Sequence, residues 1–525
     1  MPQGGRKVPF SGKAKKQQLQ SKKDRKSGTG RESTGEVVSH VRVGKRLNSQ
    51  PSISGRARAN RYALQFKEDS KEEDARRREL ARKALNYLPE EALEVDPETP
   101  YPAELDFPKR PAWDSSMGRD ALEAREQKYL RDFLDDLGKK FDWSELSYFE
   151  MNLETWRQLW RVLEMSDIVL FIVDIRFPVY LFPPTLYTYV TETLGKNMIL
   201  VLNKVDLAPA PLVLAWKHFF LNRYPALQVL MFTAFPGYNL RESSSKPGGL
   251  KVRRRKGKQR MAAEGAQQVL QACEKIVNND IDLSSWHKKI AEELQADFDD
   301  ECLEVGESIQ VVSVSRTPGH TKHFQTIFLT PKVRLCDCPG LVFPSKVPKT
   351  LQVLMGSYPI AQLREPFSSV QYLAERLNLV TMLKLQHPEN DTEWSAFDIC
   401  DAWAKQRGFI TAKAARLDSY RAANHLLRMA LDGKVCLCLY PPQYVAKKDK
   451  WEHHGELKEV LKVQAKAIEE GVEDIEDDQM LSSDDEEASS ESNASSEASA
   501  ESDGNDRVGP STVTRNKFAL LVDDD

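Results

Sequence analysis

Three short apolar runs, separated by stretches of helical periodicity, form the clearest pattern along the chain. The runs cover 167–174, 197–203 and 227–233 and are rich in Val, Ile and Leu. Continuous apolar runs of this length predict strands that are buried on both faces of a sheet. The intervening stretches 185–194 and 211–222 predict helices. Strands that alternate with helices indicate a parallel α/β sheet.

Further elements are predicted on both sides of this region. Before the first strand, helical spacing covers 119–137 and 153–164. After the third strand, further strands are predicted at 309–315, 326–329 and 333–336.

Beyond residue 351 the pattern is mainly helical, with helices predicted over 396–406 and 412–431. Gly433 suits a helix C-cap because glycine adopts the left-handed backbone conformation easily. A short strand, 434–440, is predicted to follow.

Charge is distributed unevenly, although the 525 residues carry a net charge of only −3. The start is basic and the end is acidic and serine-rich, a composition typical of solvated interaction tails. No apolar run approaches the ~20 residues of a transmembrane helix, and the charged start lacks the apolar core of a signal peptide. We therefore expect no membrane association and, for the seven cysteines, reduced thiols.

These patterns divide the chain into five parts. They are a basic, disordered tail (1–70), a charged helix with a proline-rich linker (71–113), an α/β domain (114–350) with a basic and acidic insertion (236–307), a helical C-terminal domain (351–445) and an acidic, serine-rich, disordered tail (446–525).

A polar tetrapeptide, Asn203-Lys204-Val205-Asp206, directly follows the second apolar run. At the carboxyl end of a buried strand, where α/β sheets bind ligands, Asp206 can accept paired hydrogen bonds from guanine N1 and N2. Adenine lacks these donors, and an unpaired buried acceptor can reject an analogue by ~10⁴-fold. Asn203 would brace the pocket and the Lys204 stem would lie on the base. Thr233 and Ala234 end the third run and fit a second contact, in which a backbone N–H points at guanine O6. For each motif the alternative is an ordinary polar turn.

Two later strings have the composition of GTPase switch segments. In the string RTPGHT at 316–321, Thr321 is in position to coordinate Mg²⁺. The string Asp337-Cys338-Pro339-Gly340 closes a predicted strand. The Asp337 carboxylate can hold a water on Mg²⁺, and the Gly340 N–H can contact a γ-phosphate.

In this chain the base-recognition strings, NKVD and TAF, precede the switch strings, RTPGHT and DCPG, whereas in most GTPases the switches come first. This order resembles that of circularly permuted GTPases of the YlqF/YawG group. The resemblance covers most of the chain. It implies a Rossmann-like P-loop GTPase domain with permuted strand order, followed by a helical domain. It also implies binding of GTP and Mg²⁺ and a role in ribosome assembly or growth control in the nucleus and nucleolus, with shuttling to the cytoplasm. Leu341 stands where other GTPases place a water-orienting glutamine, so unaided hydrolysis should be slow.

The family's phosphate-binding loop has no counterpart in this sequence. The family pattern places an apolar strand, a GFPNVGKS-type loop and a helix just before residue 313. This chain has Glu304–Gln310 there, and GK[ST] occurs nowhere. The loop's backbone N–H groups and lysine normally bind the β- and γ-phosphates. The sheet then also lacks one central strand, which predicts two exposed strand edges.

Two functions from different classes remain open. The first is a guanine-specific nucleotide switch, and the second is a nucleotide-free nuclear interaction protein, a degenerate isoform without the loop. The basic segments, including 251–260, predict contact with ribosomal RNA or pre-ribosomal particles and with import receptors. Ser482 and Ser483 lie among acids and are candidate phosphorylation sites. The pairs Cys336/Cys338 and Cys436/Cys438 favour free thiols over zinc, since they lack CxxC spacing.

Overall fold

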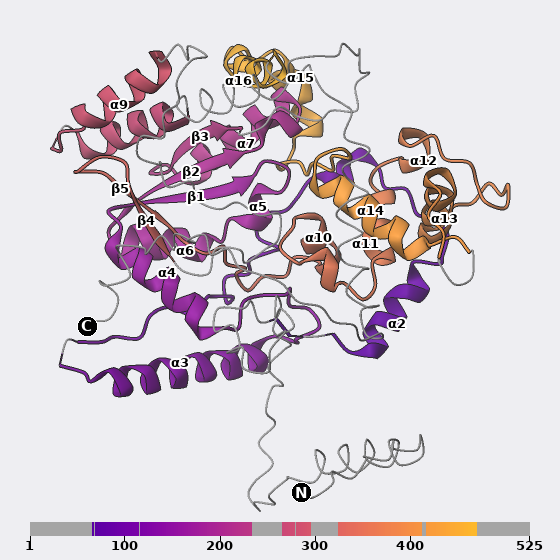
Figure 1. The fold of residues 1–525 in the computed structure, drawn as a ribbon, viewed down its shortest axis with the longest axis horizontal. Coiled ribbons are helices and arrows are strands. Elements are labelled where there is room, and N and C mark those ends of the chain that lie inside the picture. The colour runs from indigo at the N-terminus through magenta and orange to yellow at the C-terminus, as the bar shows by residue number, and fades with distance from the viewer. Residues whose placement is uncertain are drawn as a thin grey trace, which may run out of the picture.

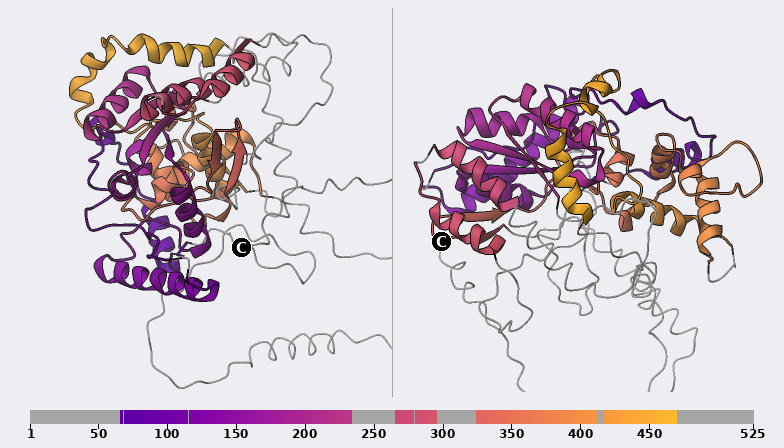
Figure 2. Two further views of the ribbon diagram at one scale, coloured as in Figure 1. Left: turned by 90° about the vertical axis from the view of Figure 1, so that its left-hand side faces the viewer. Right: turned by 90° about the horizontal axis from the view of Figure 1, so that it is seen from above.

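The computed structural model describes residues 66–67, 69–114, 116–233, 265–278, 280–295, 324–411 and 416–469. A small α/β layer lies beside a group of helices from the second half of the chain (Figure 1). The two further views in Figure 2 also show the strands beside these helices. The prediction of a disordered tail from residue 446 was wrong for its first part, because Lys448–Glu452 and Leu457–Glu469 are helices that pack against the helix Ala210–Arg223. The acidic stretch after residue 469, almost all of the basic tail and the strand predicted at 309–315 lie outside the described residues. No helix within the described ranges has the length and apolarity that a bilayer span requires.

The three apolar runs form a parallel sheet, as predicted. Its strands are β1 (Ile168–Asp174), β2 (Asn197–Asn203) and β3 (Gln228–Phe232), in the order β1-β2-β3. In the register, Asp174 pairs with Asn203, and Asn203 pairs with Phe232. The three strands therefore end together, and whatever follows them in sequence gathers at one edge of the sheet.

Strand β2 is buried on both faces because a helical layer covers each one. Ile199 and Val201 pack against Ala272 of a helix over 265–277. Leu200 and Leu202, on the opposite face, belong to the main hydrophobic core.

The prediction that all three strands are buried on both faces was wrong for β3, whose residues are all only partly buried. It was also wrong for β1. Most of its residues are only partly buried, and the Ile172 side chain is 61% exposed. Among the described residues β1 pairs only with β2, so it is an edge strand. An apolar run indicates that a strand can be buried, but actual burial also requires a neighbouring strand on each side.

A separate antiparallel hairpin carries the later strands, β4 (Gln325–Phe328) and β5 (Arg334–Asp337). Both were predicted within a residue or so of these bounds. In the turn, the Thr330 hydroxyl accepts the Val333 N–H at 3.1 Å. No described strand joins this hairpin to the β1–β3 sheet.

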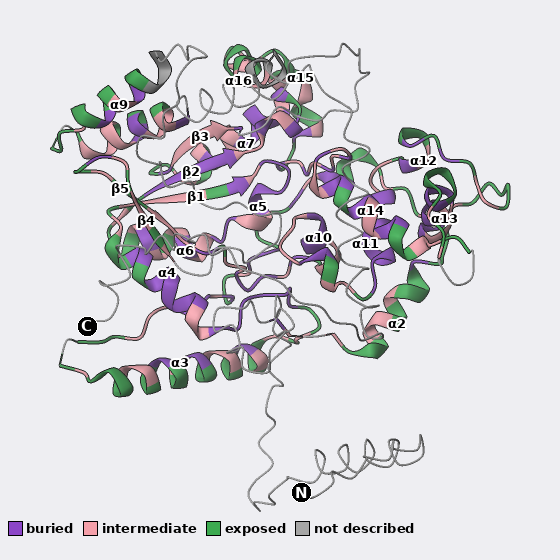
Figure 3. Cartoon of the chain, in the orientation of Figure 1, coloured by how far each residue is buried: buried purple, intermediate pink, exposed green. Residues whose placement is uncertain are grey.

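The helices surround these strands. They are α2 (Lys71–Leu80), α3 (Arg119–Lys140), α4 (Leu153–Met165), α5 (Pro178–Leu181), α6 (Pro184–Thr188), α7 (Ala210–Arg223), α9 (Ser284–Gln295), α10 (Lys349–Leu354), α11 (Phe367–Ala374), α12 (Leu379–Met382), α13 (Ala396–Arg407), α14 (Ser419–Leu431), α15 (Lys448–Glu452) and α16 (Leu457–Glu469). Figure 3 shows α4 largely buried, whereas α3 exposes its outer side. Within the predicted insertion, 236–307, the described residues form the helix over 265–277 and α9.

Three local predictions differ from the structure. The predicted helix 185–194 is α6 followed by a π-helical turn, Tyr189–Thr193. The helix predicted from 412 begins at Ser419, because the Asp418 side chain caps it by accepting the Arg421 N–H at 2.9 Å. The segment 434–440 joins no named strand, and Tyr440 forms only an isolated bridge to Glu94.

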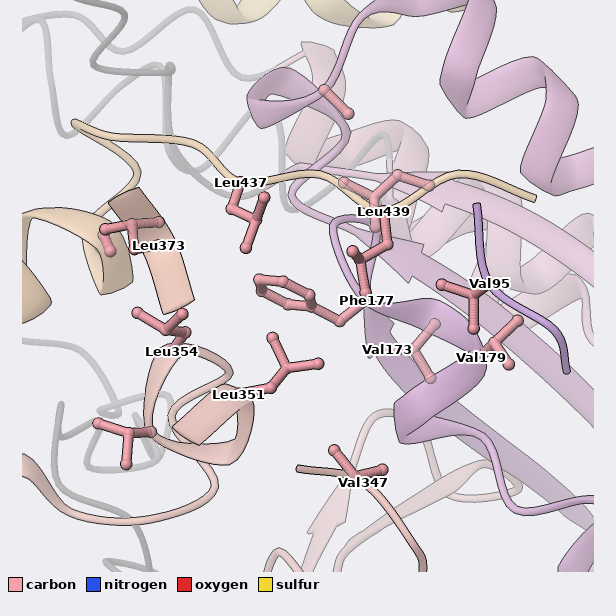
Figure 4. Close-up of a cluster of buried hydrophobic side chains, with 14 of the residues drawn as sticks. Val95, Val173, Phe177, Val179, Val347, Leu351, Leu354, Leu373, Leu437 and Leu439 are labelled. Carbon is pink, nitrogen blue, oxygen red and sulfur yellow. The ribbon is translucent and has the colours of Figure 1, made fainter. Parts of the chain in front are cut away.

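One hydrophobic core joins the α/β layer to the C-terminal helices. Phe177, just after β1, is 1% exposed. Figure 4 shows it between Leu351 of α10 and Leu437 of the segment after α14, with Leu439 beside it. The side chain of one loop residue thus fills the contact between two parts of the chain that are far apart in sequence.

Truncation of Phe177 should therefore destabilise the whole chain. Phe177→Ala is expected to lower the free energy of unfolding by roughly 3–5 kcal/mol, because it leaves a cavity where both parts meet. Urea denaturation followed by tryptophan fluorescence measures this loss. As the matched control, Ile172→Thr should change the unfolding free energy by no more than about 0.5 kcal/mol. A loss as large as that of Phe177→Ala would show that the exposed face of β1 is covered in solution.

Candidate nucleotide site

The turn after β2 displays the polar tetrapeptide at the sheet edge. Lys204 has φ 59° and ψ 38°, a left-handed conformation that few non-glycine residues adopt. The Asn203 Oδ1 accepts the Lys204 N–H at 2.8 Å and so stabilises this conformation. The chain then makes a 3-10 turn, in which Val205 and Leu207 are buried anchors. The polar residues 203, 204 and 206 are left partly exposed at the end of the strand.

The carboxylate of Asp206 is held in place by Thr233. Thr233 follows β3, is 3% exposed, and donates its hydroxyl hydrogen to Asp206 Oδ1. Burial raises the pKa of the Asp206 carboxyl group, and the Thr233 hydrogen bond opposes that shift. A partly desolvated carboxylate with a fixed orientation is suited to accept a pair of N–H donors. The structure thus brings Asn203, Asp206 and Thr233 together, whereas Ala234 lies outside the described residues.

Sequence reasoning missed a buried ion pair beside this turn. Asp174 ends β1, and Arg176 pairs with it through two hydrogen bonds, Nε to Oδ1 at 3.0 Å and Nη2 to Oδ2 at 2.8 Å. The Lys204 Nζ lies 3.0 Å from Asp174 Oδ2. Burial opposes ionisation of Asp174, yet Arg176 and then Lys204 lower its pKa to about 2. The sequence does carry a signal for this ion pair, namely an acidic residue and an arginine directly at the end of an apolar strand.

The same arginine connects the site to the C-terminal helices. Its guanidinium donates to the Ala430 carbonyl oxygen at 2.6 Å and to the Leu431 carbonyl oxygen at 3.4 Å, at the end of α14. Gly433 then has φ 79°, which confirms the predicted glycine at the helix end. A Cβ at Gly433 would lie 2.6 Å from Leu207 Cδ2, so only glycine lets the chain pass the tetrapeptide turn so closely.

A second C-terminal element holds the turn from another side. The Gln464 amide of α16 donates to the carbonyl oxygens of Val205 and Ala208, at 2.8 Å in each case. Both ends of the 3-10 turn are therefore fixed by one side chain.

The described switch residues follow a strand of a different sheet. Asp337 ends β5 and is partly buried, Pro339 is buried and Gly340 is exposed. Burial raises the pKa of the Cys338 thiol to about 12. Among the described residues β5 pairs only with β4, so Asp337 does not share a sheet with Asn203. Thr321 lies outside the described residues, and the predicted Mg²⁺ pair of Thr321 and Asp337 stays a prediction.

The cysteines of the two CxC strings are free thiols, and all four are partly buried. Cys336 and Cys338 lie on or next to β5, whereas Cys436 and Cys438 lie in the extended segment after α14. Burial raises the thiol pKa of Cys436 above its ordinary value, which keeps the thiol protonated.

Comparison with known proteins places the chain among GTP-binding proteins. It is 44% identical over 608 residues to guanine nucleotide-binding protein-like 1 of Pan troglodytes, with 99% of this chain and 100% of that protein covered. The mouse protein of the same name is 44% identical over 565 residues, with 91% and 92% covered. Large subunit GTPase 1 of Saccharomyces cerevisiae is 29% identical over 381 residues, with 65% and 58% covered.

No protein-family profile matches the chain. Among solved structures, GNP-bound YlqF from T. maritima is similar with a TM-score of 0.31 and 16% identity, over 55% of this chain and 99% of that one. A GDP-bound YlqF structure has a TM-score of 0.30 and 16% identity, over 55% of this chain and 100% of that one. These structural scores add nothing to the sequence comparison.

The parallel sheet, with the tetrapeptide turn at its carboxyl edge, agrees with the class that these relatives represent, the GTP-binding proteins. Within that class, full-length similarity at 44% identity assigns the chain to the guanine nucleotide-binding protein-like 1 family.

The buried pair at Asp174 should make stability depend on pH. Its folded-state pKa of about 2 lies below the ordinary 3.8. The ionised carboxylate therefore contributes stability that is complete above pH 3.8 and is lost as the pH falls to about 2. The loss should be on the order of 2 kcal/mol. Urea unfolding between pH 5 and pH 2 should show this loss in the wild type and not in Asp174→Asn. Asp135→Asn, on the exposed side of α3, should keep the wild-type dependence, and equal dependence in all three proteins would contradict the ion pair.

Proposed function

We propose that this chain recognises guanine nucleotides at the edge formed by β1–β3 and acts as a nuclear nucleotide switch in ribosome assembly or growth control. The observation that carries the proposal is the Asp206 carboxylate, fixed by Thr233 next to Asn203 and Lys204. Its geometry suits the N1 and N2 donors of guanine, and adenine offers no such pair. The names of the relatives, guanine nucleotide-binding protein-like 1 and Large subunit GTPase 1, agree with guanine nucleotides as the ligand.

The phosphate side of the site is weaker than the base side. The sequence has no GK[ST], and its alignment with the chimpanzee relative is 608 residues long, longer than the 525 residues of this chain. Some segments of the relative therefore have no counterpart here. We expect Mg²⁺ to bind with the γ-phosphate at Thr321 and Asp337, and the affinity for GTP to be low because backbone donors for the β-phosphate are missing. Leu341 cannot orient water, so hydrolysis should be slow.

A second candidate is a nucleotide-free interaction protein in the nucleus. Two observations on the described part of the chain favour it. There β1 is an edge strand with an exposed apolar residue, Ile172, and the hairpin that carries Asp337 forms a separate sheet. The basic segments, among them 251–260, suit phosphates of ribosomal RNA or a pre-ribosomal particle, and import receptors. These features support location in the nucleus and nucleolus for either candidate, with shuttling to the cytoplasm.

Equilibrium titration with fluorescent GTP and Mg²⁺ separates the two candidates. The chain would be compared with a repaired variant, in which a strand–GFPNVGKS–helix segment is inserted after Gly306. Micromolar binding by the chain itself, competed by GTP and not by ATP, is the result expected of the switch. Binding by the repaired variant alone would support the interaction protein. If neither protein binds, guanine recognition by Asp206 is refuted.

Asp206→Asn should change the preferred base. Xanthine carries an oxygen where guanine carries its N2 amino group, so an amide donor at position 206 suits xanthine and a carboxylate suits guanine. In the repaired variant we expect GTP affinity to fall by at least about 100-fold, while xanthosine triphosphate becomes the better competitor. Asp135→Asn, far from the sheet edge on α3, should leave both affinities unchanged. Retained GTP preference in Asp206→Asn would show that Asp206 does not read the base.

A further inference from the structure

Two histidines and a glutamate from separate segments meet on the outer side of α7. His218 lies on α7, whereas His454 and Glu456 lie in the short loop between α15 and α16, which pack against α7 (Figure 1). One potential ligand atom from each of the three residues lies within 4.8 Å of the other two. The guanine site uses none of these side chains.

The loop geometry explains why the two loop residues share one side. The Glu456 N–H donates to His454 Nδ1 at 3.3 Å, and the Leu457 N–H donates to the His454 carbonyl oxygen at 3.1 Å. The His218 and His454 rings lie 4.9 Å apart between centroids, and the Trp451 ring lies 5.5 Å from that of His218. The indole therefore shields one side of the cluster from water.

The contacts of Glu456 and His218 leave atoms that could bind a metal ion. Lys217 Nζ donates to Glu456 Oε2 at 2.7 Å, and the other carboxylate oxygen, Oε1, lies 3.4 Å from His218 Nε2. His218 Nε2 is buried and makes no hydrogen bond within the described residues. Burial lowers the pKa of the His218 imidazole. Metal ions bind the neutral form of an imidazole ring.

We propose that His218, His454 and Glu456 bind one divalent transition-metal ion of the zinc class. Two imidazoles and one carboxylate form a ligand set that zinc prefers, whereas Mg²⁺ and Ca²⁺ prefer oxygen ligands alone. Water completes a tetrahedral site. Lys217 orients the carboxylate through the oxygen that does not bind the metal, as outer-sphere partners commonly do. If Nδ1 of His454 is the ligand, the metal replaces the weak bond from the Glu456 N–H.

The metal ion would connect α7 to the loop that leads into α16. Helix α7 begins three residues after the 3-10 turn of the NKVD motif, and α16 bonds both ends of that turn through Gln464. An ion at the loop would thus connect the two elements that flank the motif. The site itself stands independently of nucleotide binding.

The test uses the full chain, free of any histidine tag and stripped with a chelator, titrated with Zn²⁺ against a chromophoric competitor. The wild type should bind one Zn²⁺ at this site, and His454→Gln and Glu456→Gln should each bind it at least about tenfold more weakly. The neighbouring residue supplies the matched control. His453 is exposed and lies outside the cluster, so His453→Gln should bind like the wild type. Added Zn²⁺ should raise the melting temperature of the wild type and of His453→Gln only, and Mg²⁺ should raise neither.

Co²⁺ in place of Zn²⁺ distinguishes this site from the cysteines. Imidazole and carboxylate ligands give weak visible bands, whereas thiolate ligands add an intense near-ultraviolet band. Weak bands that His454→Gln abolishes are expected. The proposal is overturned if Zn²⁺ binds only with the thiolate band, if it does not bind, or if His453→Gln weakens binding as much as His454→Gln does.

Discussion

The buried pair of Asp174 and Arg176 is the interaction on which the rest of the site depends. Desolvating both charges is costly, and the pair persists because each remaining donor or acceptor finds a partner. Lys204 satisfies Asp174 from the next strand, and the last carbonyl groups of α14 satisfy Arg176. A cation at a helix C-terminus also offsets the negative end of the helix dipole. One ion pair thereby ties the edge of the sheet, the NKVD turn and the C-terminal helices together.

The C-terminal half of the chain is therefore part of the proposed nucleotide site, because it contacts the NKVD turn directly. Gly433 passes against Leu207, and Gln464 bonds both ends of the 3-10 turn. Phe177 packs into the hydrophobic core around Leu351 and so fills the contact between the sheet and the C-terminal helices. These contacts join residues that lie far apart in sequence, so the fold as a whole, together with the local bond from Asn203, supports the left-handed conformation of Lys204. Strain of this kind persists where the surrounding structure over-determines it.

What the sequence predicts well is local. The apolar runs and the polar residues that follow them located β1, β2, β3 and the turn at Asn203, because strand burial and turn formation leave their mark within a few residues. The bracing contacts are not local. Nothing in the alternation of 434–440 indicates that Leu439 donates its N–H to the Arg176 carbonyl, or that Tyr440 meets Glu94, in place of a sheet partner. The exposure of Ile172 was missed for the same reason, since it depends on which strand lies beside β1.

The two halves of a nucleotide site contribute different things to binding. A base contact of the kind proposed for Asp206 would separate guanine from adenine, because it penalises the wrong base. Affinity comes mostly from the phosphates, which need several aligned backbone donors and a cation. In this chain the base half is held by Thr233, Asn203 and the C-terminal helices, while Asp337 lies on a hairpin of its own. Selectivity for guanine can thus be retained where the affinity for the nucleotide is low, because the residues that fix Asp206 are different from those expected to bind the phosphates.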